Sequence, residues 1–157
     1  MTQTIQIGAN MGNHQTFILM AIKRAKKSAQ NGGYPFGAVV VKDGDIVGKS
    51  NIDDQEFDPT AHAELSAIRN ACKNLKVYNL TGCKIYSSCH PCQLCLGAIK
   101  WVGIKDIFYA MDKNDAQAIG YADDIFMDDS VVLSKTKIQD ENILVFMKNW
   151  YAQRNGQ

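Results

Sequence analysis

Apolar residues recur along the chain with two different periods, and the changes of period predict the order of helices and strands. Between residues 13 and 31 the spacing is helical, and two glycines follow, which predicts a helix that ends there. Two short runs at residues 37–42 and 46–50 are joined by Asp43-Gly44, a sequence that favours a tight β-hairpin.

The rest of the chain predicts helices and strands in alternation. The expected helices are 60–74, 92–101, 112–119 and 140–153, and the expected strands are 83–88 and 104–110. Two strand–helix–strand passages after the hairpin imply a parallel portion in a sheet covered by helices. We therefore expect an α/β fold, a three-layer α/β/α sandwich with a five-stranded mixed sheet, whose fifth strand lies around residues 131–135.

Length and composition agree with one domain. A chain of 157 residues with 46% hydrophobic residues can bury a full core, so residues 1–157 are expected to form a single domain. The longest apolar runs, 17–22 and 143–147, are far shorter than the roughly 20 residues of a membrane span. The beginning of the chain lacks a basic segment followed by an apolar core. These observations predict a cytoplasmic protein with no membrane partner.

The five cysteines point to metal chemistry rather than to disulfides. An odd number without a secretion signal favours reduced thiols. Cys92 and Cys95 have the spacing of metal ligands, whereas Cys72 and Cys83 are expected to be small core residues. Cys89 lies next to the paired cysteines and is expected either in the core or in the lining of their site.

Charge gives little reason to expect a nucleic-acid partner. The net charge is +1, but residues 112–129 contain six aspartates and one lysine, a local charge of −5 that would repel phosphates. The basic cluster at residues 23–27 is interpreted as the solvated face of an amphipathic helix.

The strongest chemical pattern combines His62-Ala63-Glu64 with Pro91-Cys92-Gln93-Leu94-Cys95. One imidazole and two thiolates can hold zinc and leave a fourth position open for water, as in a catalytic site. Glu64 supplies a carboxylate that can move protons to and from that water.

Helix geometry supports the paired cysteines more directly than it supports His62 and Glu64. Cys92 and Cys95 share one helical face, and a helix N-terminus favours their thiolates. Residues two apart on a helix point about 200° away from each other, so His62 and Glu64 can serve one site only beyond the helix end. Two alternatives are a core histidine at position 62 and a structural zinc completed by His90 or Cys89.

The complete pattern resembles the zinc-dependent cytidine deaminase-like superfamily, and within it the guanine deaminases. The resemblance covers about residues 14–130 and is carried by residues 35–39, 58–64, 92–99 and 108–124. It implies a zinc-dependent hydrolase that acts on a cyclic amidine C–N bond and converts guanine to xanthine and ammonia with a zinc-bound hydroxide. Guanosine, tRNA adenosine and cytosine are alternative substrates. A catalytically silent zinc-binding scaffold is disfavoured because Glu64 is intact.

The resemblance also implies the roles of individual residues. His62, Cys92 and Cys95 would hold zinc, and Glu64 would be the catalytic proton carrier. As in the family, backbone N–H groups near Ala63 and Cys92 would steady the attacking oxygen.

Three side chains are implied as further substrate contacts. Asn51 and Asp115 would contact the purine base, and Phe36 would line or stack on it. Each has an ordinary structural interpretation as well: a polar residue at a strand end, one aspartate of a solvated stretch, and a core aromatic.

Two segments depart from the guanine deaminase pattern. His90 stands where many relatives have glutamate, and residues 131–157 resemble the family poorly. The family implies a homodimer that exchanges its C-terminal segment, to which the surface of Leu96, Ile99 and Trp101 could contribute. Burial against the sheet is the preferred interpretation for Ile99.

Overall fold

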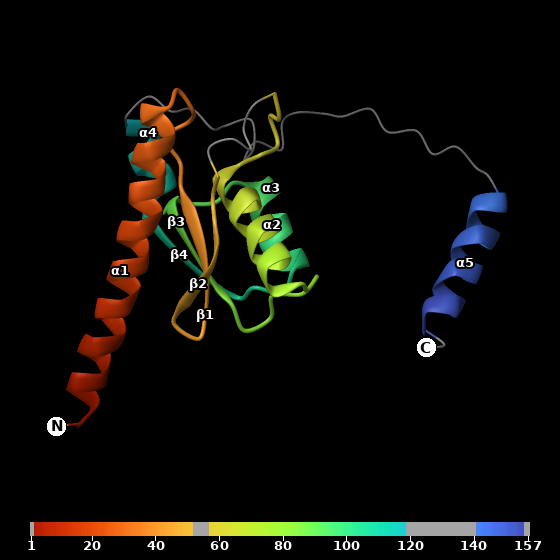
Figure 1. Ribbon diagram of the computed structural model, residues 1–157, viewed down its shortest axis with the longest axis horizontal. Coiled ribbons are helices and arrows are strands. Elements are labelled where there is room, and N and C mark those ends of the chain that lie inside the picture. Colours follow the sequence, from red (N-terminus) through yellow and green to blue (C-terminus); the bar gives the residue numbers. More distant parts are fainter. Residues whose placement is uncertain (1, 52–56, 119–140, 156–157) are drawn as a thin grey trace.

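A mixed β-sheet with helices on both faces forms the body of the protein, as the computed structural model in Figure 1 shows. The structure describes residues 2–51, 57–118 and 141–155. The elements are α1 (Thr2–Gln30), β1 (Ala38–Lys42), β2 (Asp45–Lys49), α2 (Ala63–Leu75), β3 (Lys84–Cys89), α3 (Gln93–Trp101), β4 (Asp106–Met111), α4 (Lys113–Ala118) and α5 (Glu141–Asn155).

Within the described residues the sheet has four strands, in the order β2-β1-β3-β4. Strand β1 is antiparallel to both β2 and β3, and β3 is parallel to β4, so the predicted mixed sheet is confirmed. The hairpin turns at Asp43 and Gly44, whose φ angles of 51° and 88° are those of a tight primed turn. The prediction of five strands is not met by these four, and the segment 131–135 lies outside the described residues.

The two faces of the sheet are covered by different helices. On the face that we call the α2/α3 face, Val40 and Ile85 pack against Ala67 of α2 and Ile99 of α3. The opposite face, the α1 face, packs Val39, Val41 and Tyr86 against Phe17, Ile18 and Met20 of α1. This alternation along β1 and β3 produces the three layers that the sequence predicted (Figure 1).

Two glycines allow the helices to approach the sheet closely. A Cβ atom at Gly37 would overlap the backbone of α1 at Ala21, and one at Gly48 would overlap the backbone of α2 at Ala67. Any larger residue would therefore push a helix away from the sheet.

Two helix starts differ from the predictions by three residues or more. Helix α1 begins at Thr2 rather than near residue 13, because the preceding segment contains no proline and extending a helix costs less than starting one. Helix α2 begins at Ala63 rather than at Thr60, because the carboxylate of Asp58 accepts hydrogen bonds from the Thr60 N–H and hydroxyl and holds a turn there. His62 is therefore the N-cap residue of α2.

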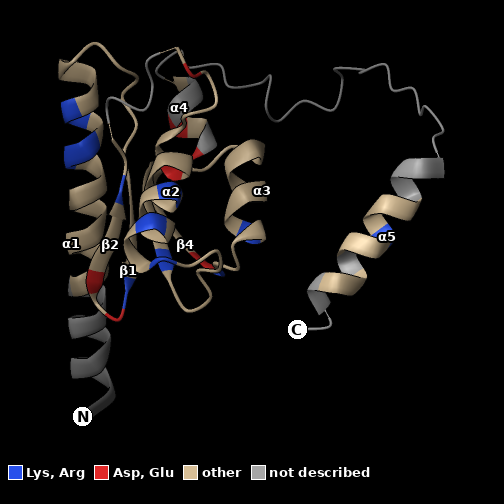
Figure 2. Ribbon diagram, turned by 45° about the vertical axis from the view of Figure 1, so that its right-hand side comes forward, with Lys and Arg blue, Asp and Glu red and all other residues tan. Residues whose placement is uncertain are grey.

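The basic cluster of α1 is mostly solvated, as predicted. Lys23, Lys26 and Lys27 are exposed, and Figure 2 shows basic residues along this part of α1. Arg24 is the exception, since its guanidinium donates to the carbonyl oxygen of Ser50 at the end of β2. None of the described helices is long and apolar enough to cross a membrane.

Candidate metal and active site

Two helix starts bring three metal-ligating side chains together. His62 is the N-cap of α2 and Cys92 is the N-cap of α3, both with extended backbone (ψ of 153° and 173°). An N-cap side chain leaves the helix at its end rather than along its wall. Cys95 follows in the first turn of α3, so the three side chains meet between the two helix N-termini.

The distances fit a tetrahedral zinc site. The Nδ1 atom of His62 lies 3.4 Å from Sγ of Cys92 and 3.5 Å from Sγ of Cys95. All three ligand atoms lie within 4.8 Å of one another. Ligands at normal Zn–S and Zn–N distances on a tetrahedron are about 3.5 to 3.8 Å apart. The set of one imidazole and two thiols is therefore preformed for zinc.

The pKa values of the two thiols are shifted in opposite directions by their surroundings. A hydrogen bond from Cys95, helped by His62, lowers the pKa of the Cys92 thiol to about 4. Donation to Cys92, followed by burial and the neighbouring Glu64, raises the pKa of the Cys95 thiol. Zinc binds thiolates, so any thiol proton that the pair carries is released when the metal binds.

Glu64 lies beside this group although it is two residues from His62 on the chain. Glu64 is 7% exposed, and its Oε1 lies 2.6 Å from the hydroxyl of Ser87 while its Oε2 lies 3.4 Å from Sγ of Cys95. The two side chains converge because His62 is an extended N-cap residue and only Glu64 is within the helix. Burial raises the pKa of Glu64, opposed by the hydrogen bond from Ser87. A carboxyl group with a raised pKa is suited to accept and return a proton near neutral pH.

Comparison with protein families identifies this arrangement. Residues 11–111 match the family described as the cytidine and deoxycytidylate deaminase zinc-binding region. The chain belongs to this family. The zinc deaminase motif of histidine, glutamate and paired cysteines thus coincides with the group that the fold brings together.

The relatives of this deaminase include guanine deaminases and tRNA-specific adenosine deaminases. The guanine deaminase of Bacillus subtilis is 49% identical over 114 residues, which are 71% of this chain and 72% of that protein. A crystal structure of guanine deaminase from Bacillus subtilis superposes with a TM-score of 0.78 at 39% identity, covering 88% of this chain and 94% of that one. The tRNA-specific adenosine deaminase of Aquifex aeolicus is 41% identical over 99 residues, covering 62% and 66% of the two chains.

In the part of the chain that the structure describes, three protein ligands are placed to hold zinc. Among the described residues, the metal-ligating groups of three or more contain His62, Cys92 and Cys95 alone. His90 lies outside this group, and its ring Nδ1 is 2.8 Å from the carbonyl oxygen of Pro91 while its edge meets Tyr109. The structural zinc completed by His90 or Cys89 is therefore disfavoured, and the fourth position remains for water or substrate.

The side chains of two predicted substrate residues pack in the hydrophobic core. Phe36 is partly buried and packs against the core of the α2/α3 face, to which Ala63 also belongs. Only the backbone N–H of Ala63, and not its buried side chain, could therefore make the predicted contact.

The two polar residues predicted to contact the base are exposed. The backbone N–H of Asn51, at the end of β2, donates to the hydroxyl of Ser66 at 2.8 Å. Asp115 and Asp112 form a reciprocal helix cap, in which each carboxylate accepts a hydrogen bond from the backbone N–H of the other residue at 2.9 to 3.0 Å. The Asp115 carboxylate thus stabilises the start of α4 in this structure.

Sequence reasoning missed Ser87, which touches Glu64 directly. A signal was present, because Ser87 and Ser88 are consecutive polar residues in a strand otherwise composed largely of apolar and aromatic residues. A buried hydroxyl needs a hydrogen-bond partner, and this one finds the carboxylate.

Proposed function

We propose that this chain is a zinc-dependent hydrolase that deaminates guanine to xanthine and ammonia. The observation that carries the chemistry is the His62, Cys92 and Cys95 group with the buried carboxylate of Glu64 beside it. Identity of 49% to a guanine deaminase, over more of the chain than the 41% match to a tRNA-specific adenosine deaminase, supports the choice of substrate.

Glu64 performs the proton transfers in this proposal. Zinc held by His62, Cys92 and Cys95 would lower the pKa of a coordinated water toward about 7. Oε2 of Glu64, which faces the ligands, accepts a proton from the attacking water. Oε2 delivers this proton to the ring nitrogen as the oxygen of the water bonds to the ring carbon. It then takes the second proton from the new hydroxyl group and delivers it to the amino group, so that the C–N bond breaks and ammonia leaves.

Three side chains and one backbone N–H group would contact the substrate in this proposal. The side chain of Asn51 and the carboxylate of Asp115 would hydrogen-bond the base, since a carboxylate accepts from guanine ring N–H groups. For Asp115 this requires it to leave the cap that it forms with Asp112. Phe36 would line the base pocket, and the backbone N–H of Ala63 would donate to the attacking oxygen.

A second candidate is adenosine in tRNA, because the relatives include several tRNA-specific adenosine deaminases at 33–45% identity. The acidic stretch at residues 112–129 disfavours this substrate, since it would repel the phosphates of an RNA.

Ammonia release from the zinc-loaded protein tests the proposal. Guanine, guanosine, cytosine, cytidine and a tRNA anticodon stem-loop are offered side by side at equal concentration. Turnover of guanine alone supports the proposal. Turnover of another substrate with guanine inert contradicts it and assigns the base contacts differently.

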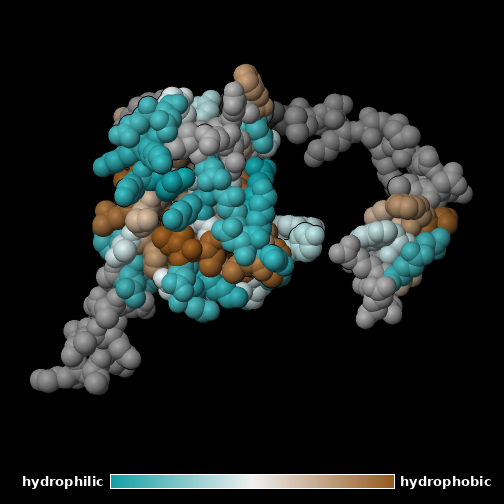
Figure 3. Space-filling view, in the orientation of Figure 1, coloured by the Kyte–Doolittle hydropathy of each residue, from teal (hydrophilic) through white to brown (hydrophobic). Residues whose placement is uncertain are grey.

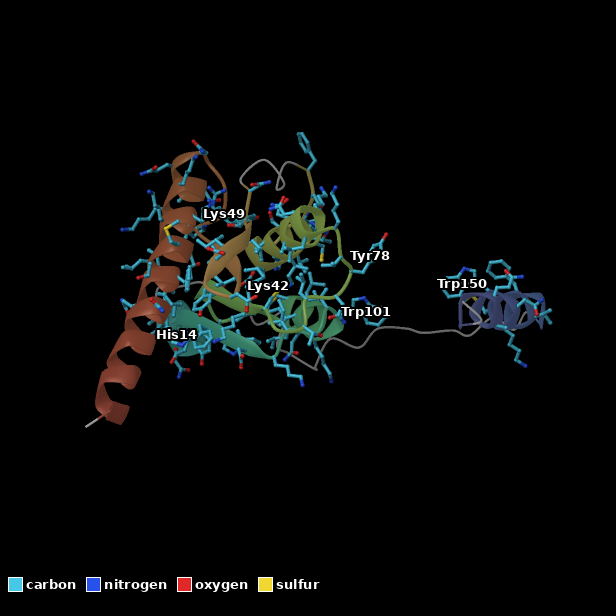
Figure 4. All side chains as sticks on the ribbon, turned by 60° about the horizontal axis from the view of Figure 1, so that its bottom comes forward. His14, Lys42, Lys49, Tyr78, Trp101 and Trp150 are labelled. Atoms are coloured by element: carbon cyan, nitrogen blue, oxygen red, sulfur yellow. The ribbon has the colours of Figure 1, made fainter. Side chains whose placement is uncertain are left out.

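We also propose that residues 1–157 form one cytoplasmic deaminase domain of purine metabolism that works as a homodimer with an exchanged C-terminal segment. Large apolar side chains are exposed on α5 (Figure 3), among them Phe146 and Trp150. Tyr78 and Trp101 project from the surface as well (Figure 4), whereas Ile99 is buried as preferred. Light scattering of the full chain, and of a chain ending before Glu141, tests both the dimer and the exchange.

A further inference from the structure

We propose that Ser87 is a positioning residue, whose hydroxyl holds Oε1 of Glu64 and thereby turns Oε2 toward the metal ligands. The inference rests on the proposed role of Glu64 as the proton carrier. It assigns the proton transfer to one oxygen of the Glu64 carboxylate and identifies the side chain that keeps that oxygen in place.

The two carboxylate oxygens have different partners. Oε1 accepts a hydrogen bond from the hydroxyl of Ser87 at 2.6 Å, and Oε2 lies 3.4 Å from Sγ of Cys95. Rotation about the last bond of a glutamate side chain is broad, so packing alone fixes the carboxylate plane poorly. A short hydrogen bond to one oxygen removes that freedom and gives the two oxygens separate roles.

Ser87 is held rigidly enough to set this orientation. It is 1% exposed and lies on β3, between β1 and β4. Its backbone is in register with Ala38 on one side and with Tyr109 on the other. A donor on a central strand keeps its position better than one on a loop, which is the property that a proton carrier requires of its support.

The arrangement works in both protonation states of Glu64. The Ser87 hydroxyl can donate to Oε1 whether or not Oε2 carries a proton. Oε1 is engaged by Ser87, which leaves Oε2 as the oxygen on the side of the ligands. The carboxylate can therefore accept and return protons without rotating between the two steps.

The neighbouring Ser88 provides a matched control. It is also a buried serine, 8% exposed, but its hydroxyl accepts a hydrogen bond from the backbone N–H of Gly37 at 3.0 Å. Removing either hydroxyl deletes one buried oxygen from the same strand, and only one of the two touches Glu64.

The kinetic test compares Ser87→Ala, Ser87→Thr and Ser88→Ala in zinc-loaded full-length protein. We expect Ser87→Ala to lower kcat about 10- to 100-fold, the usual effect of removing an outer partner of a metal site. KM and the zinc content stay near those of the wild type, and Ser87→Thr, which keeps the hydroxyl, recovers most of the loss. In a Glu64→Gln background Ser87→Ala has no additional effect. Equal kcat for Ser87→Ala and Ser88→Ala overturns the proposal.

A structural test does not depend on the substrate. In crystal structures of the zinc-loaded variants, we expect Glu64 to keep one orientation in the wild type and in Ser88→Ala, and to leave it in Ser87→Ala. An unchanged Glu64 in Ser87→Ala refutes the positioning role, whichever amine the enzyme uses. If guanine is inert while Glu64 moves only in Ser87→Ala, the proposed substrate is wrong and the positioning role stands.

Discussion

Consecutive residues of β3 place polar groups on opposite faces of the sheet, and the two faces use them differently. On the α2/α3 face the hydroxyl of Ser87 meets the carboxylate of Glu64. On the α1 face the hydroxyl of Tyr86 meets Nδ1 of His14 at 2.8 Å. Figure 4 shows His14 on α1 where the helix meets the sheet.

The difference lies in what surrounds each hydrogen bond. The pair of Tyr86 and His14 is enclosed by the rings of Phe17 and Phe108, with ring centroids 4.3 to 5.8 Å apart, and no metal-ligating group adjoins it among the described residues. The pair of Ser87 and Glu64 adjoins Cys95. One face therefore anchors a helix, and the other orients a reactive carboxylate. Variants on each face test whether the two faces are this separate.

The largest contrast is expected for zinc. Cys95→Ala removes one of the three zinc ligands on the α2/α3 face. Because two remaining ligands bind zinc too weakly to retain it, we expect the zinc content to fall from about one ion per chain to nearly none, and deamination to stop. Cys83→Ala is the control, since Cys83 is also a buried cysteine, on the α2/α3 face, but is no member of the ligand group. Metal analysis after dialysis measures both. Zinc retained by Cys95→Ala at the level of Cys83→Ala would contradict the assignment.

Glu64→Gln separates chemistry from metal binding. We expect kcat to fall by about 10²- to 10⁴-fold, the usual contribution of a general acid–base residue, while zinc stays bound. His14→Gln changes a polar group on the α1 face and should leave kcat near that of the wild type. Steady-state ammonia release and metal analysis of both variants check this. Near-normal turnover by Glu64→Gln would remove the proton carrier from the mechanism.

Local signals were sufficient to predict much of this molecule. The hairpin at Asp43-Gly44, the order of helices and strands, and the paired cysteines at a helix start all depend on residues close together in the sequence. The start of α2 was missed because the Asp58 turn and a helix N-cap favour the same residue types. That error concealed why His62 and Glu64 can share one site.

Contacts between distant residues were beyond the reach of sequence patterns. The hydrogen bond between Ser87 and Glu64 joins residues 23 apart, and the one from Arg24 to Ser50 joins residues 26 apart. In the sequence, Ser87 is an ordinary serine and Arg24 is an ordinary basic residue on an amphipathic helix. Only the packing of β3 against α2, and of α1 against the residue that follows β2, gives these side chains their partners.

On the α1 face we expect a loss of stability and not of chemistry. Tyr86 is 1% exposed, so Tyr86→Ala should lower the free energy of unfolding by about 3 to 5 kcal/mol, the range for a buried aromatic side chain. Tyr78→Ala removes the same ring where it is 94% exposed and should change it by less than about 0.5 kcal/mol. Urea unfolding measures both, and kcat per folded molecule should stay near that of the wild type. A large loss of kcat in folded Tyr86→Ala would show that the faces are coupled.

The smallest expected effect is a dependence on alkaline pH. Burial, with a minor contribution from Asp106, raises the pKa of Tyr86, so the folded state favours the neutral phenol. Such a group contributes stability fully below the unfolded pKa of about 10 and loses it as pH rises through the folded pKa. Tyr86→Phe lacks the hydrogen bond to His14 and should be less stable than the wild type by about 1 kcal/mol at pH 8. Above pH 10 the unfolded wild-type chain gains a phenolate that the folded chain resists, so the difference in unfolding free energy between wild type and Tyr86→Phe should narrow.

Unfolding free energies of the two proteins at several pH values measure this, and the remaining tyrosines cancel in the comparison. A difference that widens with pH would mean that the α1 face stabilises the phenolate, and would give that face an electrostatic character closer to that of the metal site.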